Sequence, residues 1–266
     1  VVAGIDWMDP APGEPWMVRL RDVLTGQHQV QAIHCGHLHR QITTQFAGIS
    51  AAGLGALSLT QFNALMGPGT ERVAALTAAQ VDGLTPAEVS ALGARVANLS
   101  AAALGSLDAG QVAGATLNAL NATQLGALTT EQLTSVTPAQ AVSLTTAQLQ
   151  ALGTDVSGLP ATAVAAVNLS SMTAAQLTAL TSSQLTGVTF DKAFALTAAQ
   201  VAALGPDIAG LPSTAVAGLS ATAVDGLTTA QVTALGVKVA SLSTAAIASL
   251  DATQFAAVSP AAIGVL

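Results

Sequence analysis

An eight-residue repeat runs through the chain from Leu76 onward and limits what the chain can fold into. The typical octad reads Leu, Thr or Ser, two variable residues, Gln, an aliphatic residue, one variable residue, and Ala or Gly. Examples are LTAAQVDG at 76–83, LTPAEVSA at 84–91, LTTEQLTS at 128–135, LTTAQLQA at 144–151, LTSSQLTG at 180–187, LTAAQVAA at 196–203 and LTTAQVTA at 227–234. Four repeats have seven residues and begin with Leu-Gly, at Leu92, Leu152, Leu204 and Leu235. Such a short period indicates an architecture in which each element packs on its neighbours.

The Thr and Gln positions of the octad predict the start of a helix. A Thr that caps a helix and a Gln three residues later can exchange hydrogen bonds in a capping box, while the flanking Leu and Leu or Val pack together as a hydrophobic staple. Pro86 and Pro138 follow their Thr directly, at the first helical position, where a missing amide hydrogen costs nothing. With a new cap every eight residues, we expect helices of at most about one and a half turns, which are unstable alone.

These features predict an all-α fold, a solenoid of very short capped helices built from the eight-residue repeats. Each repeat would bury its Leu and Leu/Val positions against its neighbours, with Ala and Gly allowing close backbone approach. A β-solenoid is the competing interpretation, because Thr and Val favour strands. Ala and Gln are abundant, however, and strict alternation is absent. The high aliphatic content also disfavours a disordered linker.

Composition divides the chain near Ser50. The first 50 residues hold all four histidines, both tryptophans and the only cysteine, Cys35, which cannot form an internal disulfide. We expect three regions: a small α/β fragment at 1–50, a transition segment at 51–75 and the octapeptide-repeat solenoid at 76–266. The chain carries a net charge of −7 without a basic cluster, which argues against a nucleic-acid partner. No run approaches the roughly 20 apolar residues of a membrane helix, so no membrane span is expected.

The repeats offer little catalytic chemistry. Their carboxylates are isolated from one another and lack histidine or cysteine neighbours, and they match no calcium-binding pattern. Examples are Asp82, Asp108, Asp155, Asp207, Asp225 and Asp251. We expect these acids to be solvated or to cap helices. The many threonines have no base to activate them as nucleophiles. No catalytic residue and no cofactor is therefore expected in residues 51–266.

The GHLH element at 36–39 is the one metal-binding type of motif in the chain. His37 and His39 lie two residues apart, so in an extended segment both imidazoles can face one site. With its surroundings, "WMDPAPGEPWMVRLRDVL…VQAIHCGHLHR…TTQFAGI", this stretch resembles the C-terminal part of the calcineurin-like metallophosphoesterases, in particular the class III cyclic-nucleotide phosphodiesterase branch. The resemblance covers residues 1 to about 49.

The resemblance implies two divalent metal ions of the Mn/Fe class, with His37 and His39 as ligands, one to each ion. It also implies further ligands, an early Asp-x-His pair, a middle Asp, an Asn-His element and one more His, which this chain lacks. Asp6, Asp9, Glu14 and His34 lie nearby, but the family gives none of them that role. A dinuclear centre needs more than two imidazoles, so we interpret the fragment as a vestige, with weak zinc or nickel binding as the alternative.

Two functions of different classes follow. The first is a structural or interaction repeat protein, a spacer, stalk or filament element, because the repeats resemble low-charge repeat regions of bacterial secreted or surface proteins. Its partners would be proteins or further copies of the chain, bound through the repeat faces, and its location would be secreted or at the cell surface. The alternative is a cytoplasmic metal-dependent phosphodiesterase, acting on cyclic nucleotides or other phosphodiesters, if the missing ligands are supplied.

Overall fold

The computed structural model describes residues 49–266, and within this range it contains helices and turns but no strand. The all-α prediction is therefore confirmed for the described residues, and the β-solenoid interpretation is wrong for them. The expected α/β fragment at 1–50 lies, apart from its last two residues, outside the described part of the chain. The described residues belong to two compact lobes that divide between Gln124 and Leu125.

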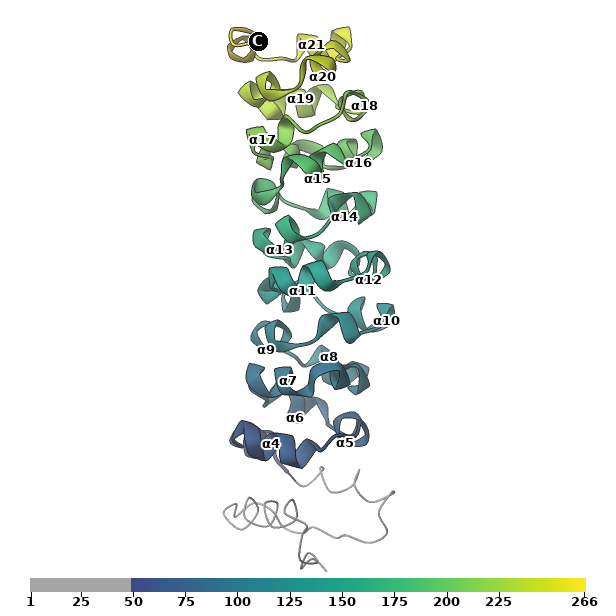
Figure 1. The fold of residues 1–266 in the computed structure, drawn as a ribbon, viewed down its shortest axis with the longest axis vertical. Coiled ribbons are helices and arrows are strands. Elements are labelled where there is room, and N and C mark those ends of the chain that lie inside the picture. Colours follow the sequence, from purple (N-terminus) through teal and green to yellow (C-terminus); the bar gives the residue numbers. More distant parts are fainter. Residues whose placement is uncertain (1–48) are drawn as a thin grey trace, which may run out of the picture. The chain divides into compact units, whose positions relative to one another are not determined.

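The first lobe consists of α-helices, several of which are labelled in Figure 1, and of 3₁₀-helices, for which we use the symbol η. They are α3 (Ala51–Gly55), α4 (Leu59–Met66), α5 (Glu71–Ala74), α6 (Ala78–Asp82), α7 (Pro86–Leu92), η3 (Gly93–Asn98), α8 (Ala101–Gly105), α9 (Ala109–Gly114) and η4 (Leu117–Ala119), followed at the division by α10 (Ala122–Leu125). The segment 51–75, expected as a transition, thus holds α3, α4 and α5. In α4, Ser58 and Gln61 already form the capping box that the octads repeat.

The second lobe continues the same kinds of element. They are η5 (Gln132–Ser135), α11 (Pro138–Ser143), α12 (Thr146–Ala151), η6 (Gly153–Gly158), α13 (Ala161–Ala166), η7 (Leu169–Ser171), α14 (Ala174–Ala179), η8 (Gln184–Gly187), α15 (Phe190–Phe194), α16 (Ala198–Ala203), η9 (Gly205–Gly210), α17 (Ser213–Val216), α18 (Ala221–Val224), α19 (Thr229–Leu235), η10 (Gly236–Ser241), α20 (Thr244–Ala248), α21 (Ala252–Ala256) and α22 (Pro260–Ile263).

Capping boxes start many of these helices, as the octad predicts. Both hydrogen bonds of the box are present for α6, α7, α9, α11, α12, α14, α16, α19 and α21, with Asp108 and Asp251 replacing Thr at the cap of α9 and α21. Pro86 and Pro138 occupy the first turn of α7 and α11. The octad therefore encodes the local structure directly.

Two details differ from the expected pattern. Helices α7 and α19 have seven residues each, longer than one and a half turns, because each runs on into the Leu of a Leu-Gly repeat. The octads at 128–135 and 180–187 form 3₁₀-helices, η5 and η8, where α-helices were expected. In these two octads the amide after the cap position, at Thr130 and Ser182, is bound by an aspartate from later in the chain, Asp155 and Asp207.

Packing follows a rule of three within each lobe. In the first lobe, contacts join α3 to α6 and α6 to α8, α4 to α7 and α7 to α9, and α5 to η3 and η3 to η4. Each element thus packs on the one three places later, and the lobe has three columns. Three repeats of eight, eight and seven residues, such as 76–83, 84–91 and 92–98, bring the chain back to the same column. We call such a set of three repeats one turn of the lobe.

The second lobe has three columns of the same kind. The first column contains η5, η6, α14, α16, α18 and α20; the second contains α11, α13, η8, η9, α19 and α21; the third contains α12, η7, α15, α17, η10 and α22. Figure 1 shows part of the first column, with α14, α16 and α18 following one another on the right-hand side. The three columns enclose the core of the lobe.

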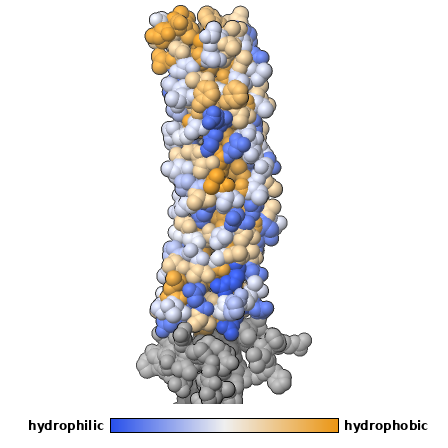
Figure 2. Space-filling view, viewed as in Figure 1, coloured by the Kyte–Doolittle hydropathy of each residue, from blue (hydrophilic) through white to orange (hydrophobic). Residues whose placement is uncertain are grey.

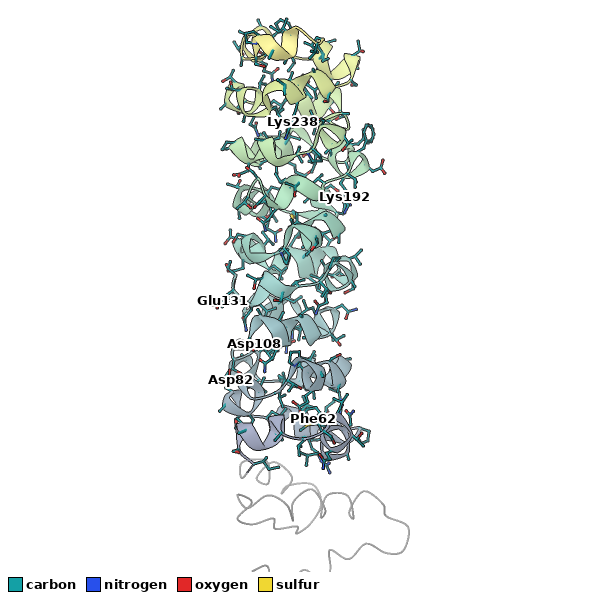
Figure 3. The ribbon with its side chains drawn as sticks, turned by 90° about the vertical axis from the view of Figure 1, so that its left-hand side faces the viewer. Phe62, Asp82, Asp108, Glu131, Lys192 and Lys238 are labelled. Carbon is teal, nitrogen blue, oxygen red and sulfur yellow. The ribbon has the colours of Figure 1, made fainter. Side chains whose placement is uncertain are left out.

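The core is made mainly of the Leu that begins a repeat and the aliphatic residue that follows the Gln, although Leu144 and Leu250 are only half-buried and Phe255 is exposed. In the octad 196–203, Leu196 and Val201 are both buried, and Phe62 fills the same kind of position in α4 (Figure 3). Burying one such side chain contributes about 1.5–3 kcal/mol. Helices of four to eight residues are not stable by themselves, so this packing between columns holds them.

Glycine is required at two kinds of position. In the four Leu-Gly repeats the Gly has a φ of 54–56°, in the left-handed region, and turns the chain from the preceding helix into a 3₁₀-helix. At Gly210 the φ is ordinary, but a Cβ would overlap the backbone carbonyl of Ser182, one turn earlier. A backbone group cannot move aside as a side-chain tip can, so this approach is open only to Gly.

Replacing Gly210 with Ala is expected to lower the free energy of unfolding by about 1–3 kcal/mol, because the new methyl group would force two backbones apart. Gly105→Ala is the matched control, since a Cβ there meets no described atom within 4 Å, and its effect should stay within about 0.5 kcal/mol. Urea unfolding followed by far-ultraviolet circular dichroism measures both. Equal effects of the two substitutions would contradict the close approach.

Candidate functional site

The residues predicted as metal ligands, His37 and His39, lie outside the described part of the chain, as do Asp6, Asp9, Glu14 and His34. Between residues 49 and 266, no group of three or more His, Cys, Asp or Glu side chains is placed to hold a metal ion. None of the helices in that range is long and apolar enough to cross a membrane. Most of the polar side chains that bind an earlier part of the described chain lie in the capping boxes and in the Leu-Gly repeats, and Ser106 and Ser249 also do so.

The Gln of the capping box binds two parts of the chain at once, as Gln231 shows. Its Oε1 accepts hydrogen bonds from the amide of Thr228 at 3.0 Å and from the Thr228 hydroxyl at 3.3 Å. Its Nε2 donates to the carbonyl oxygens of Val201, Ala202 and Gly205 at 2.7, 3.3 and 3.1 Å. The side chain is 1% exposed. One amide group therefore starts its own helix and ties that helix to the preceding turn.

The same double role recurs along both lobes. The Nε2 atom donates to carbonyl oxygens 25–31 residues earlier from Gln80, Gln111, Gln124, Gln176, Gln184, Gln200, Gln231 and Gln254. Apart from Ile49, which precedes the first described helix, the residues that carry these carbonyls lie near the end of a helix or just beyond it, where carbonyls lack the regular amide partner four residues later. Several of them, such as those of Val81, Leu149 and Val201, also accept from the backbone amide three residues later. The glutamines thus cap one helix at its start and another at its end.

Glu88 occupies the Gln position in the capping box of α7 and shows why Gln is the usual residue there. Its Oε2 accepts from the amide and hydroxyl of Thr85 at 2.7 and 2.9 Å, as a box Gln would. Its Oε1 stands where a Gln would carry the Nε2 donor. Glu88 is 2% exposed, and this Oε1 is the buried side-chain oxygen or nitrogen without a partner in the described residues. A buried polar atom left without a partner costs about 1–3 kcal/mol.

Exchanging the two residue types should change stability in opposite directions. Glu88→Gln supplies the missing donor and should raise the free energy of unfolding by about 1–2 kcal/mol. Gln231→Glu keeps the cap acceptor but places an oxygen against three carbonyls, and should lower the free energy of unfolding by about 1–3 kcal/mol. Urea unfolding at neutral pH measures both. A destabilised Glu88→Gln variant would contradict the proposed role of Nε2.

In the Leu-Gly repeats, charged side chains also bind backbone groups of the preceding turn. The fourth residue of each is charged, although charged residues make up only 8% of the chain. Arg95 donates to the carbonyl of Gly67, and Lys238 donates to those of Ala209 and Leu211 at 2.6 and 2.8 Å. Asp155 and Asp207 instead accept from backbone amides, those of Thr130 at 3.0 Å and Ser182 at 2.7 Å. All four charges therefore bind the preceding turn.

Lys192 replaces the Gln in the octad VTFDKAFA, at 188–195. Its Nζ donates to the carbonyl of Ala165, 27 residues earlier, as a box Gln would. A lysine has no acceptor atom, so Lys192 cannot bind the amide of Thr189 as a box Gln would. The Thr189 side chain itself makes no cap bond at the start of α15. Partial burial lowers the pKa of Lys192. Figure 3 labels both lysines of the second lobe, Lys192 and Lys238.

Two of the repeat acids cap helices, as expected. Asp108 accepts from the amide of Gln111 at 2.6 Å, and Asp251 accepts from those of Thr253 and Gln254 at 2.7 Å each. The hydrogen bond from the Thr253 hydroxyl, at 2.6 Å, is the largest cause that holds the pKa of Asp251 below its ordinary value of 3.8. Asp155 and Asp207 also cap the start of a helix, but that helix lies in the preceding turn. The sequence gives no sign of this, because each aspartate is isolated in it.

The lowered pKa of Asp251 predicts a local pH dependence. Because the pKa is depressed in the folded state, the cap is fully present above about pH 4 and is lost as the pH falls through the folded-state value. Thr253→Ala removes the largest cause and should move the pKa of Asp251 upward, toward 3.8. Carboxyl-carbon NMR titration of the wild type and this variant measures the shift. An unchanged or lower value in the variant would show that the hydroxyl does not act on Asp251.

The double role of the glutamines and the cross-turn bonds of the charged residues were not predicted from the sequence. A signal for each was present. Gln outnumbers Glu at the fifth octad position, which a cap acceptor alone does not require, and all four Leu-Gly repeats carry a charge at one position.

Comparison with known proteins adds no relative: no protein-family model matches the chain, and no match is found among curated proteins or solved structures.

Proposed function

We propose that the chain is a structural or interaction repeat protein, a spacer, stalk or filament element, whose repeats build a solenoid with three repeats in each turn. The observation that carries this proposal is the use of the polar side chains. The box glutamines and the charged residues of the Leu-Gly repeats bind the backbone of the preceding turn. The polar side chains of the repeats thus serve mainly to join one turn to the next, which suits a protein with a structural function.

The outward-facing residues support the same proposal. The variable positions of the octads are mostly Ala, Thr and Ser, and on the face drawn in Figure 2 blue and orange residues are interspersed. A low-charge surface of this kind resembles the repeat regions of bacterial secreted or surface proteins. We place the protein in that setting, secreted or at the cell surface, with proteins or further copies of the chain as its partners through the repeat faces.

The second candidate function, a metal-dependent phosphodiesterase, rests on the GHLH motif. In that reading His37 and His39 would each bind one of two Mn or Fe ions, which would activate water for attack on a phosphodiester. Two imidazoles are too few to hold both ions in a reactive geometry. We therefore propose that residues 1–50 are the vestige of such an enzyme, and that the chain needs no cofactor for its structural role.

The two functions are separated by a hydrolysis assay. With excess manganese, the chain should release AMP from cyclic AMP, or nitrophenol from bis(p-nitrophenyl) phosphate, at no more than the background rate. The comparison is between the intact chain and the His37→Ala, His39→Ala double variant. Hydrolysis by the intact chain that disappears in the double variant would show that a metal site forms and would reject the vestige.

A further inference from the structure

In the column formed by α4, α7 and α9, the box residue of a later helix can bind the link that leads into the helix one turn earlier. On α9, the Nε2 atom of Gln111 donates to the carbonyl oxygens of Val81, Asp82 and Leu84, at 2.8, 3.1 and 2.6 Å. These carbonyls lie at the end of α6 and in the link from α6 to α7. The corresponding contacts in the second column of the second lobe are made by Gln184, Gln231 and Gln254. A buried side-chain donor thus fastens one turn to the next in this column.

The junction one turn earlier, between α4 and α7, lacks this donor. Helix α7 packs on α4 as α9 packs on α7, so Glu88 holds the position in α7 that Gln111 holds in α9. The Glu88 side chain is 2% exposed, and its Oε1 has no partner in the described residues. An ionised carboxylate oxygen accepts hydrogen bonds but cannot donate to the carbonyls of the preceding link. Apolar packing is therefore left to hold α7 to α4.

The first turn that the structure describes, residues 50–75, is also weakly capped. Of its three helices, α4 begins with a complete capping box, whereas Gly53 takes the Gln position in α3 and the Thr70 side chain makes no cap bond at α5. In the next turn, α6 and α7 both begin with complete boxes. Gln80 and Arg95 still bind carbonyls of the first described turn or just before it, from the other two columns. The loosest side of this turn is therefore the one that faces α7.

We propose that the junction between α4 and α7 is a built-in opening point, at which residues 50–75 separate from the first lobe as one unit while residues 76–124 stay folded. Repeat arrays are held together by contacts between neighbours, so a weak contact lowers the cost of opening at that place. One buried acceptor without a partner raises the opened population roughly 5- to 100-fold. In a spacer or stalk, this junction is the part that yields first. The opening depends on these contacts alone, whichever function the chain has.

The test is amide hydrogen exchange of the full chain at neutral pH, followed by mass spectrometry of its peptic peptides. In the wild type, amides of α4 should exchange about 10-fold faster or more than those of α9, because α4 opens locally. Glu88→Gln supplies the junction with a donor and should slow exchange in α4 roughly 5- to 100-fold. Exchange in α9 should stay as in the wild type. The matched control is Glu131→Gln, which removes the same charge from an exposed side chain of the second lobe and should change neither helix.

A second variant, Gln111→Glu, moves the defect to the next junction. It should speed exchange in α6 and α7 by a similar factor, because Gln111 binds the link between them. The opening point is overturned if α4 exchanges no faster than α9 in the wild type, or if Glu88→Gln slows both helices equally, which would indicate unfolding of the whole lobe. Unchanged exchange of α4 in Glu88→Gln, or of α6 and α7 in Gln111→Glu, would overturn it as well. None of these results affects the hydrolysis assay, so the proposed function is judged separately.

Discussion

The hydrogen bonds of the box glutamine are the interaction on which the described structure depends. A helix of four to eight residues loses more entropy on forming than its few internal hydrogen bonds return. In Gln231 one end of the amide group fixes the start of the helix and the other end binds the preceding turn. Local and tertiary structure therefore form together. Gln is suited to this role because it has an acceptor and a donor on one planar group, whereas Glu has only acceptors when ionised.

The sign of the charge in each Leu-Gly repeat follows from what the neighbouring turn offers. Asp155 and Asp207 lie in η6 and η9, which pack on the 3₁₀-helices η5 and η8. There the two aspartates accept hydrogen bonds from backbone amides just before those helices, at Thr130 and Ser182. Lys238 lies in η10, which packs on α17, and there it donates to carbonyls that precede the helix. A charge that looks isolated in the sequence is thus paired with a backbone group one turn away.

The sequence was sufficient for most of the local structure, with the 3₁₀-helices η5 and η8 as exceptions, but not for the arrangement of turns. The cap at Thr145 and Gln148 could be predicted because both partners lie three residues apart. The bond from Gln176 to the carbonyl of Leu149 could not, since it depends on how many repeats make a turn. The number of repeats in a turn is set by the angles at which neighbouring helices pack, and an eight-residue period in the sequence does not reveal those angles. The metal ligands His37 and His39 stay a prediction, because they lie outside the described residues.

Three repeats in each turn impose a rule on how such a chain can change in length. Deleting one octad would move every later repeat of its lobe to the next column, so residues from one side of the lobe would be transferred to another. The glutamines would still find carbonyls, because every octad presents them, and the core would still be filled with Leu and Val. Only the surface would be rearranged. Gain or loss of three repeats at a time would instead leave each later repeat in its own column. Related proteins could therefore differ in length without a change in the residues that each side presents, or differ in those residues without a change in length.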